Sequence, residues 1–347
     1  EKIMSLASVW SELDLDAPGR QVGWIRVEHS VHRSAYGTIP VPLAAFANGE
    51  GPTVLLMAGS HGDEYEGQLA LTKLIRTLDV SRVKGRILVL PAANQPAVTA
   101  GQRTSPLDGG NLNRSFGERP SDTPTGQIAA FIAEEILPLC DAFLDLHSGG
   151  SSMRHLSCSY ADLGENQTTG EKAFAALEAM NAPLSWAQPG VPVAPVAGRA
   201  ALRKGAIHLS GEFGGGGALN EADLRVAERC IYRLLDHLGI LPLAAEWQES
   251  VPTRFVFSTQ AHFSYAPREG VFEPAVHLGD QVQAGQLAGW LHRPENPDEP
   301  PVALHFASSG IVVVMRAMGR CRPGDCLLQL LQERSRAEVL DRIRALA

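Results

Sequence analysis

The sequence lacks several features that mark large classes of proteins. It contains no apolar run close to the roughly 20 residues that a membrane-spanning helix needs, and its first ten residues, EKIMSLASVW, lack the apolar stretch of a signal peptide. Lysine and arginine form no cluster, and the net charge is −8, which argues against a nucleic-acid-binding surface. We therefore expect a cytoplasmic protein that binds neither membranes nor nucleic acids and whose partners are small molecules.

Cysteine is scarce and carries no recognisable pattern. The five cysteines are scattered and odd in number, and no two of them form a CxxC pair: Cys140, Cys158, Cys230, Cys321 and Cys326. This excludes a disulfide framework and a cysteine-based zinc knuckle. We expect the thiols to be buried or incidental.

Short apolar runs alternate with amphipathic segments through most of the chain, whose 347 residues are 44% hydrophobic. Continuous apolar runs of this length are typical of strands that are covered on both faces. Strands are predicted at 53–58, 86–92, 141–147, 155–160 and within 205–217, and helices at 66–78, 127–137, 171–180 and 220–238. Strands that alternate with helices predict an α/β fold with a largely parallel sheet.

Three regions are predicted from the change of pattern along the chain. Residues 1–250 form the α/β region, of which 1–50 is an extended N-terminal part. Residues 251–331 are β-rich and hold two segments with a Gly-Asp turn, a faint repeat that resembles the biotinyl/lipoyl fold. The last lysine is Lys204, so this part cannot carry covalent biotin or lipoate, and we interpret it as a lid, a support or an oligomer contact. Residues 332–347 are predicted to be a helical tail.

Histidine and carboxylate side chains follow two of the predicted strands. Parallel strands share a crevice at their carboxyl ends, so His61 and Glu64 after one strand can meet His147 at the end of another. A catalytic zinc ion takes three such ligands and keeps one position open for water. The alternatives are a loop histidine, an acid favoured by a helix dipole, and a histidine bonded to a backbone carbonyl. His155 and His208 lie in apolar runs without a neighbouring acid, and we assign them to the core.

A long polar loop and a glycine run supply further candidates. Arg103 could face a developing oxyanion, and the segment NLNR, with Asn113 and Arg114, could hold a carboxylate, although solvated surface arginines would look the same. Glu212 precedes four glycines, and beside a zinc ion it becomes a natural general base. The glycine run matches neither GxGxxG nor a GK[ST] ending, which argues against a phosphate loop.

Four motifs in this order carry a resemblance. GSHGDEYEG, NLNRSF, DLHSGG and GEFGGGG resemble those of the succinylglutamate desuccinylase/aspartoacylase family, relatives of the zinc carboxypeptidases. AGQRTSPLDGGNLNRSF and GVFEPAVHLGD are most similar to the bacterial branch that includes N-acetyl-diaminobutyrate deacetylases. The resemblance implies a zinc-carboxypeptidase-like mixed, largely parallel sheet flanked by helices, with a smaller C-terminal all-β domain of barrel-sandwich type.

The resemblance also implies a role for each candidate residue. Glu212 matches the family's proton shuttle, Arg103 the arginine that polarises the scissile carbonyl, and Asn113 and Arg114 the pair that holds the substrate's carboxylate. The implied ligands of one Zn²⁺ per chain are His61, Glu64 and His147. The implied activity is hydrolysis of the amide bond of a small N-acyl amino acid, by a chain that could form a homo-oligomer.

Two alternatives and one question stay open at this point. The same zinc chemistry would serve a metallocarboxypeptidase or an amidase acting on peptide or peptidoglycan fragments. A binding protein derived from an enzyme would be expected to lack a ligand or the base, and all of them are present. A cationic side chain such as that of diaminobutyrate would need an acid facing it, and the candidates are Asp63, Glu66, Asp108 and Asp145.

Overall fold

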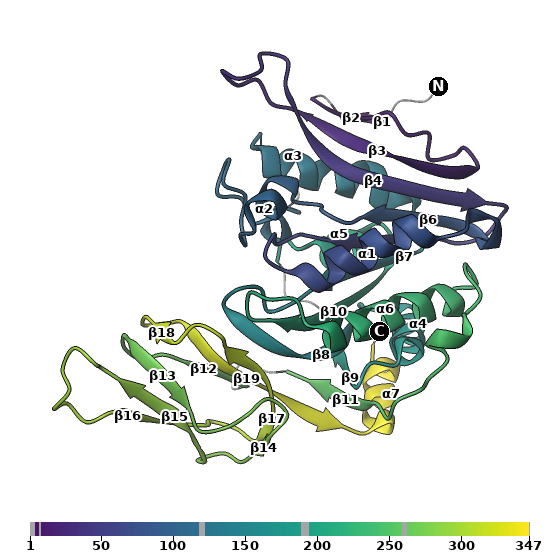
Figure 1. Cartoon of the computed structure of the whole chain (residues 1–347). Coiled ribbons are helices and arrows are strands. Elements are labelled where there is room, and N and C mark those ends of the chain that lie inside the picture. Colours follow the sequence, from purple (N-terminus) through teal and green to yellow (C-terminus); the bar gives the residue numbers. More distant parts are fainter. Residues whose placement is uncertain (1–3, 7, 118–121, 189–193, 259–261, 347) are drawn as a thin grey trace.

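The centre of the protein is a block of parallel strands within one long mixed sheet (Figure 1). The computed structural model describes residues 4–6, 8–117, 122–188, 194–258 and 262–346. The block has the strand order β6-β5-β7-β10, with β5 (Thr53–Ala58), β6 (Gly85–Leu90), β7 (Ala142–His147) and β10 (Ile207–Gly215). All three pairings in the block are parallel. The predicted parallel strands and α/β class are confirmed.

The N-terminal part extends the sheet on one side. Its strands pair antiparallel with one another, and the last of them pairs antiparallel with β6. They are β1 (Met4–Leu6), β2 (Val9–Ser11), β3 (Gly19–Glu28) and β4 (Thr38–Asn48). The extended N-terminal segment expected from the sequence is therefore an edge of the main sheet.

Helices cover both faces of the parallel block. In β7, Leu144 and Leu146 belong to one hydrophobic cluster and Phe143 to the other, which explains why the strand is apolar at successive positions. The first cluster includes residues of α1 (Tyr65–Thr77), α4 (Gln167–Met180), α6 (Glu221–His237) and α7 (Arg336–Arg344). The second includes residues of α3 (Pro124–Phe131), which continues through a π-helical turn (Ile132–Ile136), and of α5 (Ala197–Arg203).

Of the helical tail predicted at 332–347, residues 336–344 form α7, which packs against α4, whereas residues 332–334 still belong to a strand. The side chain of Ser335 accepts a hydrogen bond from the backbone of Glu338, and the Glu338 side chain accepts one in return, so the helix begins with a capping box. No helix in the described part of the chain is long and apolar enough to cross a bilayer.

Three short elements differ from the sequence-based expectation. The segment interpreted as one long loop after β6 contains α2 (Gln95–Ala100), and β9 (Leu184–Gln188) and α5 were not predicted. Pro96 lies in the first turn of α2, and Gly101 ends the helix with a left-handed backbone, φ 61°. Proline and glycine that close to each other indicate a loop, and a helix of this length shows too few apolar repeats to outweigh them.

The C-terminal β-rich part is joined to the main sheet by strand pairing. β8 (Met153–Asp162) pairs with β10 on one side and with β9 on the other. β9 pairs in turn with β11 (Arg254–Phe257), and β11 pairs with β19 (Cys326–Arg334). β17 (Gly310–Arg316) pairs with β19 and also with β8. The strands β8, β9, β11, β19 and β17 therefore form a closed ring. Its core includes Cys158, Leu184, Val256 and Leu331.

A second, four-stranded sheet lies beyond the ring, at the far end of the molecule from β1 (Figure 1). Its strands are β13 (Gly270–Pro274), β15 (Leu287–His292), β16 (Val302–His305) and β18 (Arg320–Cys321); β12 (Phe263–Tyr265) and β14 (Gln281–Val282) pair with β19 and β17. The predicted C-terminal β region is confirmed. A domain boundary near residue 250 stays a prediction, and the strand pairing continues across that point. The zinc-carboxypeptidase-like arrangement of the sheet also stays a prediction.

Candidate active site

The chemistry-bearing residues meet where the strands of the parallel block end. His61 and Glu64 lie in the segment between β5 and α1, and Glu64 is the residue that precedes the helix. His147 ends β7, and the sheet register places Glu212 of β10 directly beside it. Because β5, β7 and β10 are adjacent, residues more than 80 positions apart come together at this edge.

Two imidazoles and one carboxylate converge there. His61 Nδ1 lies 2.7 Å from Glu64 Oε1, and His147 Nδ1 lies 2.9 Å from Glu64 Oε2. One ligand atom from each of the three residues lies within 4.8 Å of the others, and all three residues are buried. The observed group is a candidate cation site, and the alternative of a His147 ring bonded to a backbone carbonyl does not describe the contacts of that ring, which are with Glu64 and Asp145.

The outer nitrogen of each imidazole also has a partner. His61 Nε2 lies 3.1 Å from Asn111 Oδ1, and His147 Nε2 lies 2.8 Å from Asp145 Oδ2. Since a carboxylate and an amide oxygen accept hydrogen bonds, Nε2 of each ring can donate to these partners, and in that tautomer both Nδ1 atoms are available to a cation held by Glu64. Histidine ligands in metal sites are held in the same way, so the donor set fits a zinc ion.

The charges inside this cluster reinforce one another. Burial alone would raise the pKa of Glu64, but the hydrogen bonds and charges of His147 and His61 hold it well below its usual range. Burial alone would lower the pKa of His147, but Asp145 and Glu64 raise it well above its usual range. The cluster therefore keeps an ionised carboxylate in a buried position, as a cation site requires.

Glu212 lies beside the cluster, and its pKa is shifted in the opposite direction to that of Glu64. Burial raises the pKa of Glu212 to about 8, and within the described residues its Oε2 has no hydrogen-bond partner. The nearest basic atom is His155 Nε2, at 3.9 Å, and burial lowers the pKa of His155 to about 4. A carboxyl group whose pKa is close to the working pH can act as a general base and as a general acid.

The predicted polar residues of the long loop face the same space. Arg103 Nη1 lies 3.4 Å from Glu64 Oε1, and half of the Arg103 side chain is exposed (50%). The backbone N–H of Ala197 donates to Asn113 Oδ1 (3.0 Å), and Arg114 Nη1 donates to the Asn113 carbonyl oxygen (2.7 Å). A cavity of about 300 Å³ is lined by all seven predicted site residues: His61, Glu64, Arg103, Asn113, Arg114, His147 and Glu212.

A second cavity of about 210 Å³ adjoins the first, since both are lined by Asn113, His147 and Glu212. His208 lines the second cavity and His155 the first, although the sequence assigned both to the core. The signal that could have found His208 is its spacing from Glu212, because residues four apart on one strand point to the same face.

The glycine run after Glu212 has a backbone role. Gly214, Gly215, Gly216 and Gly217 all have positive φ, at 69°, 108°, 80° and 74°. The N–H groups of Gly216 and Gly217 donate to the carbonyl oxygen of Gly150, at 2.7 and 2.9 Å. The run therefore turns the chain against the loop that follows β7, and only glycine adopts such a series of conformations without strain.

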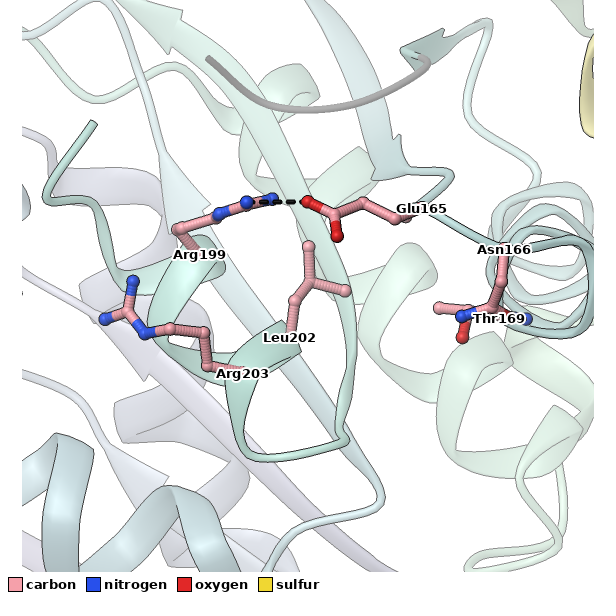
Figure 2. Close-up of a pocket in the computed structure, with 7 residues that line it drawn as sticks. Glu165, Asn166, Thr169, Arg199, Leu202 and Arg203 are labelled. Atoms are coloured by element: carbon pink, nitrogen blue, oxygen red, sulfur yellow. Dashed lines mark hydrogen bonds and ion pairs between the residues drawn. The ribbon is translucent and has the colours of Figure 1, made fainter. Parts of the chain in front are cut away.

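A further hollow lies away from this site, between the start of α4 and α5 (Figure 2). It has a volume of about 140 Å³. Arg199 points toward Glu165 in Figure 2 and forms an ion pair with it at 2.6 Å. Because this acid and this base neutralise each other, neither offers a free charge to a ligand in the hollow.

The edge of the α/β sheet thus presents a His-Glu-His cluster that could hold a cation beside the partly buried carboxyl group of Glu212. Residues 50–238, more than half of the chain, match the succinylglutamate desuccinylase/aspartoacylase catalytic domain. The chain belongs to the succinylglutamate desuccinylase/aspartoacylase family, and the resemblance seen in the sequence is confirmed.

Individual relatives cover nearly the whole chain. It is 32% identical over 315 residues to the N-alpha-acetyl-L-2,4-diaminobutyric acid deacetylase of Halomonas elongata, covering 91% of this chain and 92% of that protein. A succinylglutamate desuccinylase/aspartoacylase from Rhodobacter sphaeroides superposes with a TM-score of 0.89 at 33% identity, covering 94% and 99% of the two chains. The product-bound ectoine utilization protein of Ruegeria pomeroyi superposes with a TM-score of 0.90 at 33% identity, covering 94% and 100%.

Proposed function

We propose that this chain is a zinc-dependent hydrolase that removes the acyl group from a small N-acyl amino acid. The observation that carries the proposal is the convergence of His61, Glu64 and His147 in one cavity with Glu212. The similarity to an N-alpha-acetyl-L-2,4-diaminobutyric acid deacetylase supports an N-acetyl amino acid, with N-acetyl-2,4-diaminobutyrate as the first candidate.

In this proposal the buried cluster holds the metal and Glu212 moves the proton. His61, Glu64 and His147 are the ligands. A bound zinc ion would lower the pKa of a water from about 15.7 toward 7 and polarise the amide carbonyl. Glu212 takes a proton from the water whose oxygen attacks the acyl carbon, and returns it to the nitrogen as the carbon–nitrogen bond breaks. The products are a carboxylate and a free amino acid.

The arginines at the cavity have separate tasks. The Arg103 guanidinium, beside the cluster and half exposed, can donate to the oxyanion that forms on the acyl oxygen. Asn113 and Arg114, fixed to each other through the Asn113 carbonyl, can hold the free carboxylate of the substrate. Holding both ends orients the amide toward the attacking water.

The alternative of a metallocarboxypeptidase or amidase is less well supported. A peptide substrate requires an extended groove on both sides of the scissile bond. The site instead consists of two adjoining cavities of about 300 and 210 Å³, a size that suits one modified amino acid.

The proposal is tested with metal-stripped and zinc-loaded protein. We expect about one zinc per chain by elemental analysis, and release of the acyl group from N-acetyl-2,4-diaminobutyrate, measured by mass spectrometry, with zinc alone restoring it. N-acetyl-aspartate, N-succinyl-glutamate, a peptide and a muropeptide are offered in parallel. His147→Ala should lose zinc, whereas His277→Ala, at a histidine with 93% of its side chain exposed, should retain it. Zinc bound equally by both variants, or cleavage of the peptides alone, would refute the proposal.

A further inference from the structure

The N-terminal strands of the main sheet have one covered face and one bare face. In β3, Ile25 and Val27 are fully buried and pack with Leu43 of β4 in the hydrophobic cluster that includes residues of α3. Successive side chains of a strand point to opposite faces, so the even-numbered residues of β3 lie on the other, outer face. There Val22 is 51% exposed and Trp24 is 44% exposed. The outer face therefore leaves large apolar side chains in contact with solvent.

The chain covers this outer face at one end. Ala44 and Phe46 of β4 are fully buried in the cluster that includes residues of α1. Pro42, which lies beside Trp24 in the sheet register, is half-buried, and Pro40 is exposed. In Figure 1 the strands β1 to β4 form the top of the molecule, and no other described element is drawn beyond them. The rest of the face is therefore accessible to another molecule.

Exposed apolar side chains are concentrated in this hairpin. Eight large hydrophobic residues are clearly exposed in the described part of the chain. Three of them, Val22, Trp24 and Tyr36, belong to β3 and to the loop that joins it to β4, whereas the other five lie in five separate segments. Clustered apolar side chains on a protein surface mark contact sites, and tryptophan is enriched at the centre of such contacts. The composition of the outer face is thus that of a contact surface.

The charges on the outer face select the kind of partner. Arg20 and Glu28 lie four residues before and four residues after Trp24, on the same face of β3. Arg20 donates to a backbone carbonyl in the last turn of α1, and neither residue forms an ion pair with another described residue. Arg26, between them, already pairs with Glu12 at 2.6 Å. The face thus has a positive charge at one end, a negative charge at the other and an apolar centre.

A second copy of the chain matches this distribution of charge. When two identical strands lie antiparallel across a twofold axis at Trp24, Arg20 of each copy faces the partner's Glu28, and the apolar centres of the two faces meet. Packed sheets lie about 10 Å apart, and arginine and glutamate are long enough to meet across that distance. A membrane surface, or a partner with charge of one sign, would be complementary to one end of the face and would repel the other.

We propose that the outer face of β3 and β4 binds a second copy of this chain and forms a twofold-symmetric homodimer centred on Trp24. The proposal goes beyond the proposed function and does not depend on it, because none of the residues of this face lines either cavity of the candidate active site. The contact lies at the opposite end of the molecule from the C-terminal sheet, for which an oligomer contact was one interpretation of the sequence (Figure 1).

The mass of the particle in solution tests the proposal. Sedimentation velocity of the full chain, from about 1 to 100 µM, should show a species of twice the chain mass of 37.1 kDa. Trp24→Glu places two like charges at the centre of the interface and should weaken the dimer by about tenfold or more. Tyr265→Glu is the matched control, since Tyr265 is a 51% exposed aromatic residue of the C-terminal part, and it should dimerise like the parent.

Both changes are made at exposed side chains, and circular dichroism should show that both variants are folded. A parent chain that sediments at 37.1 kDa throughout this range would overturn the proposal. So would a folded Trp24→Glu variant that dimerises as tightly as the parent.

Exchanged charges test the predicted pairing of Arg20 with the partner's Glu28. Arg20→Glu brings two acids together at each end of the interface, and Glu28→Arg brings two bases together, so each variant alone should dimerise about threefold or more weakly than the parent. An equimolar mixture of the two variants restores an opposite pair at both ends, and so does the double variant. Both should recover an affinity close to that of the parent. A mixture and a double variant that associate no better than the single variants would overturn the proposal.

Vesicles of phosphatidylcholine and phosphatidylglycerol test the membrane as the alternative occupant. We expect the parent chain to dimerise in their absence and to stay in solution when they are sedimented. A chain that remains a monomer but sediments with the vesicles, and loses this binding in Trp24→Glu, would overturn the proposal and assign the outer face to a membrane surface.

Discussion

At the scale of single residues, the site depends on side chains that are themselves held by hydrogen-bond partners. Asp145 and Asn111 each bind the outer nitrogen of an imidazole, so the inner nitrogens keep their direction toward Glu64. Arg103 differs from these residues because half of its side chain is exposed and its nearest charged atom is 3.4 Å away. Its removal should therefore change the reaction more than the fold.

We expect Arg103→Ala to lower kcat by about 100-fold or more, the usual effect of losing one oxyanion donor. Zinc content and the far-ultraviolet circular dichroism spectrum should stay unchanged. Arg114→Ala is the comparison, and it should mainly raise KM because Arg114 is proposed to hold the carboxylate of the bound substrate. Steady-state kinetics on the same substrate measure both. Near-normal turnover in Arg103→Ala would remove Arg103 from the mechanism.

His208 should make stability depend on pH. Burial lowers its pKa to about 4, whereas in the unfolded chain a histidine titrates near 6.5. Between these values the unfolded state binds the proton and the folded state does not, so the free energy of unfolding falls as the pH is lowered, by roughly 3 kcal/mol at most. His208→Gln should show a shallower fall than the parent between pH 6.5 and pH 4 in urea titrations.

The control for this titration is His277→Gln, at a side chain that is 93% exposed. Its pH dependence should parallel that of the parent chain. Parallel curves for all three proteins would show that His208 is not kept neutral by the fold.

The convergence of the candidate site residues was predictable where a sequence motif lies at the end of a predicted strand. His61, Glu64, His147 and Glu212 lie at or just beyond buried apolar strands, so their convergence followed from parallel pairing alone. The spacing of His208 from Glu212 places both on one face of β10, but whether His155 and His208 line a cavity depends on what packs over their strands. That information resides in long-range packing and not in the neighbouring residues.

At the scale of elements, α5 determines how closely the second cavity is covered. Gly198 in its first turn faces His208 of β10 so closely that a Cβ atom would lie 2.2 Å from the ring. The helix can rest on the sheet at this point only because glycine has no side chain. The sequence around α5, AGRAALR, is short and gave no apolar repeat that would predict a helix here.

Gly198→Ala tests this contact. The added methyl must push α5 or the His208 ring aside, so we expect a loss of about 1–3 kcal/mol in stability and a lower affinity for free 2,4-diaminobutyrate. Thermal unfolding and calorimetry measure the two effects. Gly319→Ala, where the nearest atom to an added Cβ is 3.8 Å away, should change neither. A Gly198→Ala protein with the stability and affinity of the parent would contradict the assigned packing.

At the scale of the whole molecule, the alternation of strands and helices made the parallel block predictable, whereas the ring was not. Nothing local to β8 indicates that β17, more than 140 residues later, pairs with it through His155 and Val314. This ring has a structural consequence for the site, because β8 carries His155 and Tyr160 and β9 carries Trp186. The walls of both cavities are therefore tied to the C-terminal strands.

We expect the ring to make the two parts of the chain unfold together. β8 pairs on one edge with β10 of the parallel block and on the other with β9 and β17, so opening β17 exposes the core around Val256 and leaves residues 153–155 of β8 without a partner on that edge. Hydrogen exchange with mass spectrometry, at rising urea, should give peptides from β5, β8 and β17 one common opening free energy. Val256→Ala should lower that value in all three peptides by about 2 kcal/mol, whereas His277→Ala, at a side chain that is 93% exposed, should leave it unchanged. If the β17 peptide opens at lower urea than β8 and β5, or if Val256→Ala affects it alone, the C-terminal strands form an independent domain and the cavity walls are not held by the ring.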